Sequence, residues 1–209
     1  MNDHYFSSQP HTASKPRTIT VRLAGREVDV TTDAGVFSPS RLDPGTAVLL
    51  KNLPVPPAGD ILDMGCGWGP ISLQAGLEAR DDDTDVRVWA LDVNERSLSL
   101  TRENAKTAGL TSVTPVLAQD IPDSVQFSTI WSNPPIRVGK DVLHDLLLTW
   151  LPRLVPGGEA WLVVSKNLGA DSLATWMVEN LPGGWDVRKE ASAKGFRVLV
   201  VTKPEDPEV

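Results

Sequence analysis

The stretch DILDMGCGWGP, residues 60–70, combines a short apolar run with three closely spaced glycines and a proline. The apolar run predicts a buried strand over residues 60–64, and Pro70 suits the first turn of a helix that follows the glycines. Glycines at such a junction allow unusual backbone angles and let a ligand lie against the main chain. Their G-x-G-x-G spacing differs from the G-x-G-x-x-G of dinucleotide-binding folds, and a plain tight turn is an alternative interpretation.

Short apolar runs alternate with longer amphipathic segments through most of the chain. This alternation indicates an α/β fold with a Rossmann-like, doubly wound, mainly parallel seven-stranded sheet. Residues 185–191 and 196–202 are expected to close the sheet as an antiparallel hairpin, and residues 17–32 to form a separate short N-terminal β-hairpin. The other expected strands are 60–64, 86–93, 112–118, 127–132 and 159–166, and the expected helices are 46–53, 70–79, 95–110, 141–154 and 171–180.

The composition fits a single domain over residues 17–203, because 41% of the 209 residues are hydrophobic. A flexible leader is expected at residues 1–16 and an acidic tail at 204–209. The net charge of −7 argues against general attraction to nucleic acid, so no DNA partner is expected and RNA contact needs a local basic patch. The single cysteine, Cys66, excludes a cysteine-based zinc cage, and no metal is expected. Without a signal peptide or an apolar run of roughly 18 residues, a cytoplasmic protein with no membrane partner is expected.

Polar residues mark the carboxyl ends of four consecutive predicted strands: Asp63, Asp92, Asp120 and Asn133. Doubly wound sheets bind ligands beyond these ends. A carboxylate of Asp63 over the glycine loop would repel a pyrophosphate and attract an ammonium group. Asp92 could accept hydrogen bonds from the two hydroxyls of a ribose, and Asp120 could accept one from an adenine amino group. The alternative interpretations are an acid at the start of a helix for Asp92 and an ordinary loop acid for Asp120. S-adenosylmethionine carries an ammonium group, a ribose and an adenine but no phosphate. It therefore fits these three acids better than the NAD of an oxidoreductase does.

The stretch SNPPI, residues 132–136, follows the apolar run 127–131 and contains two prolines that exclude both a helix and a central strand. Together with ILDMGCGWGP and ALDVNERSLSLTRENA it resembles the class I S-adenosylmethionine-dependent methyltransferases. The closer resemblance is to the small-domain family typified by the 16S ribosomal RNA guanine-N2 methyltransferases, particularly its single-domain members. The stretches GVFSPSRLDPGTAVLL, NPPIRVGK and KGFRVLVV extend this resemblance over about residues 17–203.

The resemblance implies methyl transfer to the exocyclic N2 of a guanine in ribosomal RNA. In such enzymes the Asn133 side-chain oxygen and the Pro134 carbonyl would hold the N–H groups of the target, with Pro135 and Ile136 completing the catalytic stretch. Ile136 stands where the family usually has an aromatic residue. Other planar nitrogens (protein glutamine, adenine N6) and a non-catalytic module that binds RNA or a partner are alternatives. The cofactor-binding residues implied are Asp63, Gly65, Cys66, Gly67, Gly69, Asp92, Val93, Asn94, Asp120, Ile121 and Thr46.

The substrate side of the expected site carries positive charge. Arg137 and Lys140 follow the two prolines, and Lys194 lies in the expected C-terminal hairpin. These residues are expected to contact phosphates of ribosomal RNA or of the small ribosomal subunit, although solvated surface charge is an equal alternative. Phe37 is expected to contact the substrate and to compensate for the aliphatic Ile136. The sequence leaves the choice between monomer and homodimer open.

Overall fold

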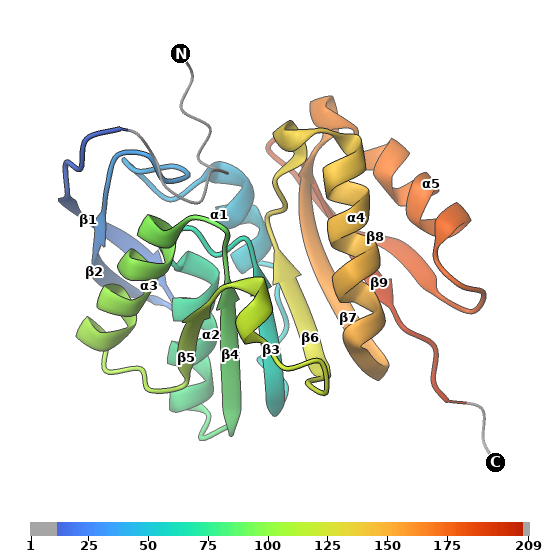
Figure 1. Ribbon diagram of the computed structural model, residues 1–209, viewed down its shortest axis with the longest axis horizontal. Coiled ribbons are helices and arrows are strands. Elements are labelled where there is room, and N and C mark those ends of the chain that lie inside the picture. Colours follow the sequence, from blue (N-terminus) through green and yellow to red (C-terminus); the bar gives the residue numbers. More distant parts are fainter. Residues whose placement is uncertain (1–11, 207–209) are drawn as a thin grey trace.

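The computed structural model describes residues 12–206, which contain two β-sheets and five α-helices (Figure 1). The small sheet is the antiparallel hairpin of β1 (Arg17–Leu23) and β2 (Arg26–Thr32). The large sheet has seven strands. In spatial order they are β5 (Val113–Val116), β4 (Val86–Leu91), β3 (Gly59–Met64), β6 (Phe127–Ser132), β7 (Leu154–Ser165), β9 (Phe196–Thr202) and β8 (Asp186–Ala193).

The direction of the strands follows the expected pattern. β3 lies between β4 and β6 and runs parallel to both, and β5 and β7 extend the parallel part on the two sides. β9 runs antiparallel to its neighbours β7 and β8. The predicted Rossmann-like sheet, its antiparallel C-terminal hairpin and the N-terminal hairpin are therefore confirmed. The strand order reverses between β3 and β6, where such sheets form their ligand crevice.

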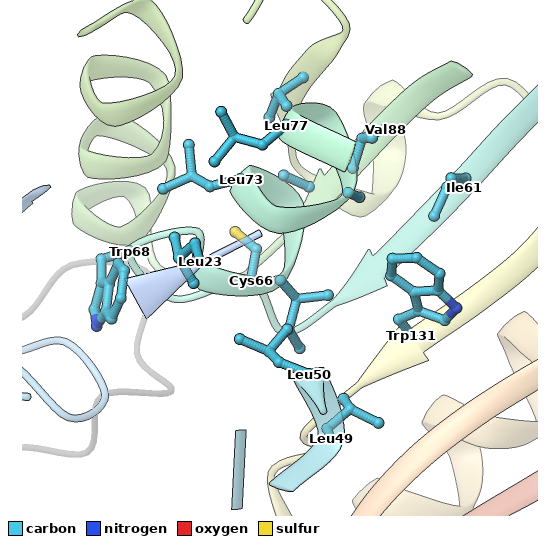
Figure 2. Packing of buried hydrophobic residues seen from close by; sticks show 14 of the residues in the cluster. Leu23, Leu49, Leu50, Ile61, Cys66, Trp68, Leu73, Leu77, Val88 and Trp131 are labelled. Atoms are coloured by element: carbon cyan, nitrogen blue, oxygen red, sulfur yellow. The ribbon is translucent and has the colours of Figure 1, made fainter. Parts of the chain in front are cut away.

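Helices cover both faces of the large sheet. The helices are α1 (Pro44–Leu50), α2 (Pro70–Asp81), α3 (Glu95–Thr107), α4 (Lys140–Trp150) and α5 (Ala170–Asn180). The β1–β2 hairpin, α1, α2 and α3 pack on one face, and α4 and α5 pack on the other. Figure 2 shows the first of these cores, with side chains of the hairpin, α1, the glycine loop and α2 gathered over β3, β4 and β6. Neighbouring strand residues enter opposite cores, as Ile130 and Trp131 do on β6.

The ends of several elements differ from the prediction because capping residues and prolines set them. The helix expected over 46–53 starts at Pro44, since the Asp43 carboxylate accepts a hydrogen bond from Thr46 N at 2.9 Å. The helix expected over 141–154 ends at Trp150, ahead of Pro152. β7 begins at Leu154 rather than at 159, and a register shift in its pairing with β6 accommodates the extra residues. Four 3-10 turns complete the fold: η1 (Ala118–Asp120), η2 (Ile136–Val138), η3 (Leu151–Arg153) and η4 (Lys166–Leu168).

The expected leader lies outside the described residues up to position 11. Within its described part, Ser14 Oγ donates to Asp33 Oδ2 at 2.6 Å, and Lys15 N donates to the other oxygen of the same carboxylate. Residues 204–206 of the expected tail are described and belong to no helix or strand. The division into leader, domain and tail stays a prediction.

A buried asparagine on α3 joins three segments that are far apart in the sequence. Asn104 Oδ1 accepts a hydrogen bond from Thr31 N at 2.7 Å, and its Nδ2 donates to Thr31 O and to Trp68 O, both at 2.9 Å. Its side chain is only 3% exposed, so water cannot replace these partners. Asn104 therefore holds the N-terminal hairpin and the glycine loop against α3.

Replacing this residue by alanine (Asn104→Ala) should destabilise the protein by about 2–3 kcal/mol, because three backbone groups lose their partner. Urea unfolding followed by circular dichroism measures the change. The matched control is Asn180→Ala, an exposed position at the end of α5 that should change stability by less than about 0.5 kcal/mol. Equal stability of the two variants would show that the hairpin does not depend on Asn104.

Candidate functional site

A cavity of about 390 Å³ lies at the carboxyl ends of β3, β4 and β6, where the strand order reverses. The glycine loop after β3 forms part of its wall, and the Asn-Pro-Pro stretch after β6 forms another part. The size suits a small-molecule ligand. The lining residues are Phe37, Asp43, Met64, Gly65, Gly67, Leu91, Asp92, Val93, Ser97, Ala118, Asn133, Pro134, Pro135, Ile136, Leu146, Trp150, Ser165, Leu168 and Phe196.

The three loop glycines all have positive φ angles, 82° at Gly65, 59° at Gly67 and 95° at Gly69. Gly65 and Gly67 line the cavity, and a Cβ at either position would meet no described atom within 4 Å. A ligand can therefore lie directly against their backbone. Gly69 serves packing instead, since a Cβ there would approach the Thr101 side chain of α3 to 3.0 Å.

Cys66 turns its side chain away from the cavity and into the core (Figure 2). Its sulfur lies 3.6 Å from Thr101 Oγ1 and is buried. Burial raises the pKa of the Cys66 thiol well above its ordinary value, so the thiol stays neutral and is a poor nucleophile. The predicted role of Cys66 in the loop is thus limited to its backbone.

Asp92 lines the cavity and ties the glycine loop to the start of α3. Its Oδ2 accepts a hydrogen bond from Gly67 N, and its Oδ1 accepts one from Asn94 N, both at 2.9 Å. Burial raises the pKa of the Asp92 carboxyl, and these hydrogen bonds oppose that shift. Asp92 also faces the cavity, where a ligand hydroxyl could donate to its carboxylate. Val93 lines the same cavity, whereas Asn94 is buried and caps α3.

Asp63 does not take the predicted position over the loop, because the nearest donors belong to α2. Its Oδ2 accepts hydrogen bonds from Ser72 N at 3.0 Å and Ser72 Oγ at 2.6 Å, and Asp63 is absent from the cavity lining. Its Oδ1 is buried and has no hydrogen-bond partner among the described residues. Burial, helped by the charge of Asp92, raises the pKa of Asp63 from 3.8 to about 7. Asp63 precedes the cavity-lining Gly65 by two residues, and an unpartnered carboxylate oxygen there fits a ligand with an ammonium group, as S-adenosylmethionine has.

The third predicted acid is not brought into the cavity. Asp120 is exposed at the end of η1, where Ala118 is the residue that lines the cavity. Ile121 is 3% exposed and packs in the core beneath α4 and α5. The sequence correctly located this turn near the cavity but could not specify which side chain of the turn faces it.

All four residues of the predicted catalytic stretch, Asn133 to Ile136, line the cavity. The amide nitrogen Nδ2 of Asn133 donates to Asp43 Oδ2 at 2.9 Å and to Thr46 Oγ1 at 3.0 Å. These bonds leave the amide oxygen as the acceptor available to a ligand. Thr46, predicted as a cofactor residue, is buried and reaches the cavity through Asn133.

The backbone after Asn133 forms a tight turn. Pro135 has φ −76° and ψ 75°, and the Pro134 carbonyl accepts a hydrogen bond from Ile136 N at 2.9 Å. The proline rings restrict the backbone here, so the direction of the Pro134 carbonyl is set before any ligand arrives. Its second lone pair can still accept a hydrogen bond.

In the described part of the chain, three aromatic side chains line the same cavity as the aliphatic Ile136. The predicted Phe37 lines the cavity and is 38% exposed. Phe196 and Trp150 line it as well, although sequence reasoning assigned neither residue to the site. Trp150 lies inside the helix predicted over 141–154 and Phe196 begins a predicted strand, so only the packing of these elements around the cavity reveals the two residues. A planar ligand has apolar faces to lie against despite Ile136.

The predicted substrate-side lysines do not line the cavity, but they lie within four positions of residues that do. Lys140 begins α4 and Lys194 lies in the β8–β9 turn, and both are exposed. Arg137 is part of η2, and its side chain lies outside the described part of the chain. Within residues 12–206, no group of three or more His, Cys, Asp or Glu residues is arranged to hold a metal ion.

Two relatives show how this chain compares with other proteins. It is 39% identical over 177 residues to YbxB of Bacillus subtilis (strain 168), a protein named as uncharacterized, with 82% of this chain and 86% of that protein covered. It is 35% identical over 175 residues to the ribosomal RNA small subunit methyltransferase C of Pseudomonas putida. That match covers 81% of this chain but only 49% of the longer enzyme, so the chain spans about half of that relative.

A solved structure with the same fold is the T. thermophilus 16S rRNA N2 methyltransferase RsmC in complex with AdoMet and guanosine. The TM-score is 0.75, and the alignment covers 90% of this chain and 50% of that one. At 24% sequence identity, this likeness bears on the fold alone.

The Asp63→Asn variant tests the buried carboxyl. Because native Asp63 binds its proton more tightly than the unfolded chain does, its contribution to stability is greatest below pH 3.8 and is lost as the pH rises through about 7. The wild type should therefore lose stability relative to Asp63→Asn by an amount on the order of 4 kcal/mol across that range. Urea unfolding at a series of pH values measures the difference, with exposed Asp123→Asn as control. Parallel pH profiles for the wild type and Asp63→Asn would contradict the assignment.

The family model of the methyltransferase small domain matches residues 27–199, which is most of the chain and includes the glycine loop and the Asn-Pro-Pro stretch. No helix in the described part of the chain has the length and apolar character needed to cross a membrane. The two ligand-facing glycines, the unpartnered Asp63 oxygen and Asp92 fit the cofactor that was predicted from the sequence. The chain belongs to the methyltransferase small domain family, and the prediction of an S-adenosylmethionine-dependent methyltransferase is confirmed.

Proposed function

We propose that this protein methylates the exocyclic N2 of a guanine in small-subunit ribosomal RNA. The observation that carries the proposal is the Asn133 amide, held by its nitrogen at the edge of the cavity so that its oxygen is left to accept from an N–H group. The curated relative from P. putida and the T. thermophilus structure, both named for methylation of the small-subunit RNA, support the choice of substrate.

The residues of the chain act mainly by position. When bound, S-adenosylmethionine supplies a methyl group on a positively charged sulfur, which is already activated for displacement. Gly65, Gly67 and Asp92 would hold the cofactor, and Asp63 would balance its ammonium charge. The lone pair of an exocyclic amine is delocalised into its ring, so the amine is a poor nucleophile. Holding that nitrogen in line with the methyl group therefore supplies most of the acceleration.

Asn133 Oδ1 and the Pro134 carbonyl would accept the two N–H bonds of the amine and direct its lone pair toward the methyl group. During methyl transfer positive charge would grow on the nitrogen, and these two preorganised acceptors would stabilise it. The proton then leaves the nitrogen for water. No strong base is needed at the site, and His144 is stacked on Trp176 at 3.6 Å rather than lining the cavity.

Exposed cations close in sequence to the cavity-lining residues support an RNA substrate. Arg41, Lys140, Lys166 and Lys194 are exposed, and each is within four positions of a lining residue. Lys166 N also donates to Gly195 O at 2.9 Å, which brings two of their loops together. Within residues 12–206, none of these four side chains forms an ion pair. By contrast, Lys189 and Arg197 on the C-terminal hairpin both form ion pairs with Asp171.

Methyl transfer from labelled S-adenosylmethionine should appear on small ribosomal subunits or their RNA, and mass spectrometry should identify N2-methylguanosine. The Asn133→Ala variant should lower kcat by about 10²–10³-fold, because one acceptor of the target amine is lost. Its affinity for S-adenosylmethionine, measured by calorimetry, should stay within about threefold of the wild type. Label on release factors or on adenine instead would select another planar nitrogen, and no label on the small subunit or its RNA would end the guanine proposal.

Neutralising two of these exposed cations should weaken RNA binding through charge alone. For the double variant Lys166→Gln/Lys194→Gln, the slope of log K against log salt should fall by about 1.5, since two phosphate contacts are removed. Lys189→Gln is the matched control, because Lys189 is already paired with Asp171 at 2.8 Å. Fluorescence titration of a ribosomal RNA fragment at several salt concentrations provides the measurement. A double variant with the slope of the wild type would remove these lysines from the RNA-binding surface.

A further inference from the structure

We infer that Asp43 and Thr46 are positioning residues that fix which end of the Asn133 amide faces the target. Their effect is to make the site accept a nitrogen that donates N–H and reject one that carries only a lone pair. The inference rests on the proposed function, since it concerns the nitrogen to be methylated.

The contact joins two elements that are distant in the sequence. Asn133 follows β6, and Asp43 caps α1, 90 positions earlier. The Asp43 oxygen that accepts from Asn133 Nδ2 also accepts from Thr46 N, each at 2.9 Å. Thr46 Oγ1 lies 3.5 Å from this carboxylate and accepts from Asn133 Nδ2 at 3.0 Å. Two acceptors therefore converge on the amide nitrogen.

The chemistry of these partners gives the amide a single orientation. An ionised carboxylate has no proton to donate, so it can only accept. If the amide were reversed, Asn133 Oδ1 would face the Asp43 oxygen at hydrogen-bond distance with no proton between them. The observed orientation avoids this repulsion and reserves Oδ1 for the ligand. An amide oxygen can accept from an exocyclic amine or an amide N–H, but it repels an unprotonated ring nitrogen or a carbonyl oxygen.

The position of Asp43 is set by close packing. A Cβ on the neighbouring Gly45 would approach the ring of Phe196 to 2.8 Å, so the first turn of α1 lies directly against β9. Asp43 and Phe196 both line the cavity together with Asn133. The same contact that places the aromatic ring in the cavity wall thus holds the carboxylate that orients the amide.

Exchanging the amide and the acid between positions 43 and 133 tests the inference. The Asn133→Asp variant places two carboxylates about 3 Å apart, which cannot both ionise, so a shared proton must hold them together. Its kcat should fall as the pH rises and that proton is lost. In the double variant Asn133→Asp/Asp43→Asn, the amide that donates the hydrogen bond stands at position 43 and no proton has to be shared. Its kcat should therefore not depend on loss of a shared proton, and at high pH it should exceed the kcat of the single variant about tenfold. A flat pH profile for the single variant, or no rescue in the double variant, would overturn the inference.

The Asp43→Ser variant separates positioning from helix capping. Serine caps a helix as well as aspartate does, but it is too short to reach Asn133. We expect kcat to fall by about 10²-fold while the affinity for S-adenosylmethionine changes less than about threefold. Exposed Asp123→Ser is the matched control. In an Asn133→Ala background, Asp43→Ser should have no further effect on kcat, and a full additional loss would show that Asp43 acts elsewhere.

A measurement without substrate distinguishes failure of this inference from failure of the proposed function. In the wild type, the Nδ2 protons of Asn133 should exchange slowly with water in nuclear magnetic resonance spectra, because both are hydrogen-bonded. They should exchange faster in Asp43→Ser. Unchanged exchange would overturn the inference whatever the enzyme methylates. Faster exchange in a protein that leaves ribosomal RNA unlabelled would instead point to a different planar nitrogen.

Discussion

The parallel pairing of β3 with both β4 and β6 is the constraint on which the site depends. Because the three strands run in the same direction, their carboxyl ends meet at one edge of the sheet. The glycine loop, Asp92 and Asn133 each follow one of these ends, so three segments distant in the sequence face a common cavity. Moving any of these strands by one residue would turn its end to the other face and dismantle the cavity.

Buried polar groups hold the loops that this pairing brings together. Asp63 binds the first turn of α2, Asp92 binds the glycine loop and the start of α3, and Asn104 binds the loop to the N-terminal hairpin. Such groups are costly to bury, and most of them here are satisfied by backbone N–H or C=O groups. The exception is Asp63 Oδ1, which lacks a partner among the described residues and carries a raised pKa. The protein thus keeps an unfavourable buried carboxyl two residues before the cavity-lining Gly65, outside the lining itself.

The walls of the cavity divide two tasks between two kinds of side chain. Asn133 and Asp43 present directional polar groups, whereas Phe37, Phe196 and Trp150 present apolar surface. The aliphatic Ile136 therefore does not leave the cavity without aromatic contacts, since these come from segments outside the Asn-Pro-Pro stretch. The polar groups determine which nitrogen is accepted, and the apolar surface covers a flat ring of whatever identity.

The sequence by itself determined the fold class, the place of the glycine loop and the polar strand ends, because periodicity and turn residues are local properties of the chain. Asn133 was predicted as a polar strand end for the same reason, whereas its catalytic role was implied by the resemblance of the Asn-Pro-Pro stretch to the methyltransferase family. Tertiary structure alone decided that Asp63 turns toward Ser72, that Asp120 stays exposed, that Asp43 contacts Asn133, and that Phe196 reaches the cavity. Each of these outcomes depends on which donor or ring packs closest in space. A contact between residues 90 positions apart, such as Asp43 and Asn133, cannot be predicted from the spacing of residues within one segment.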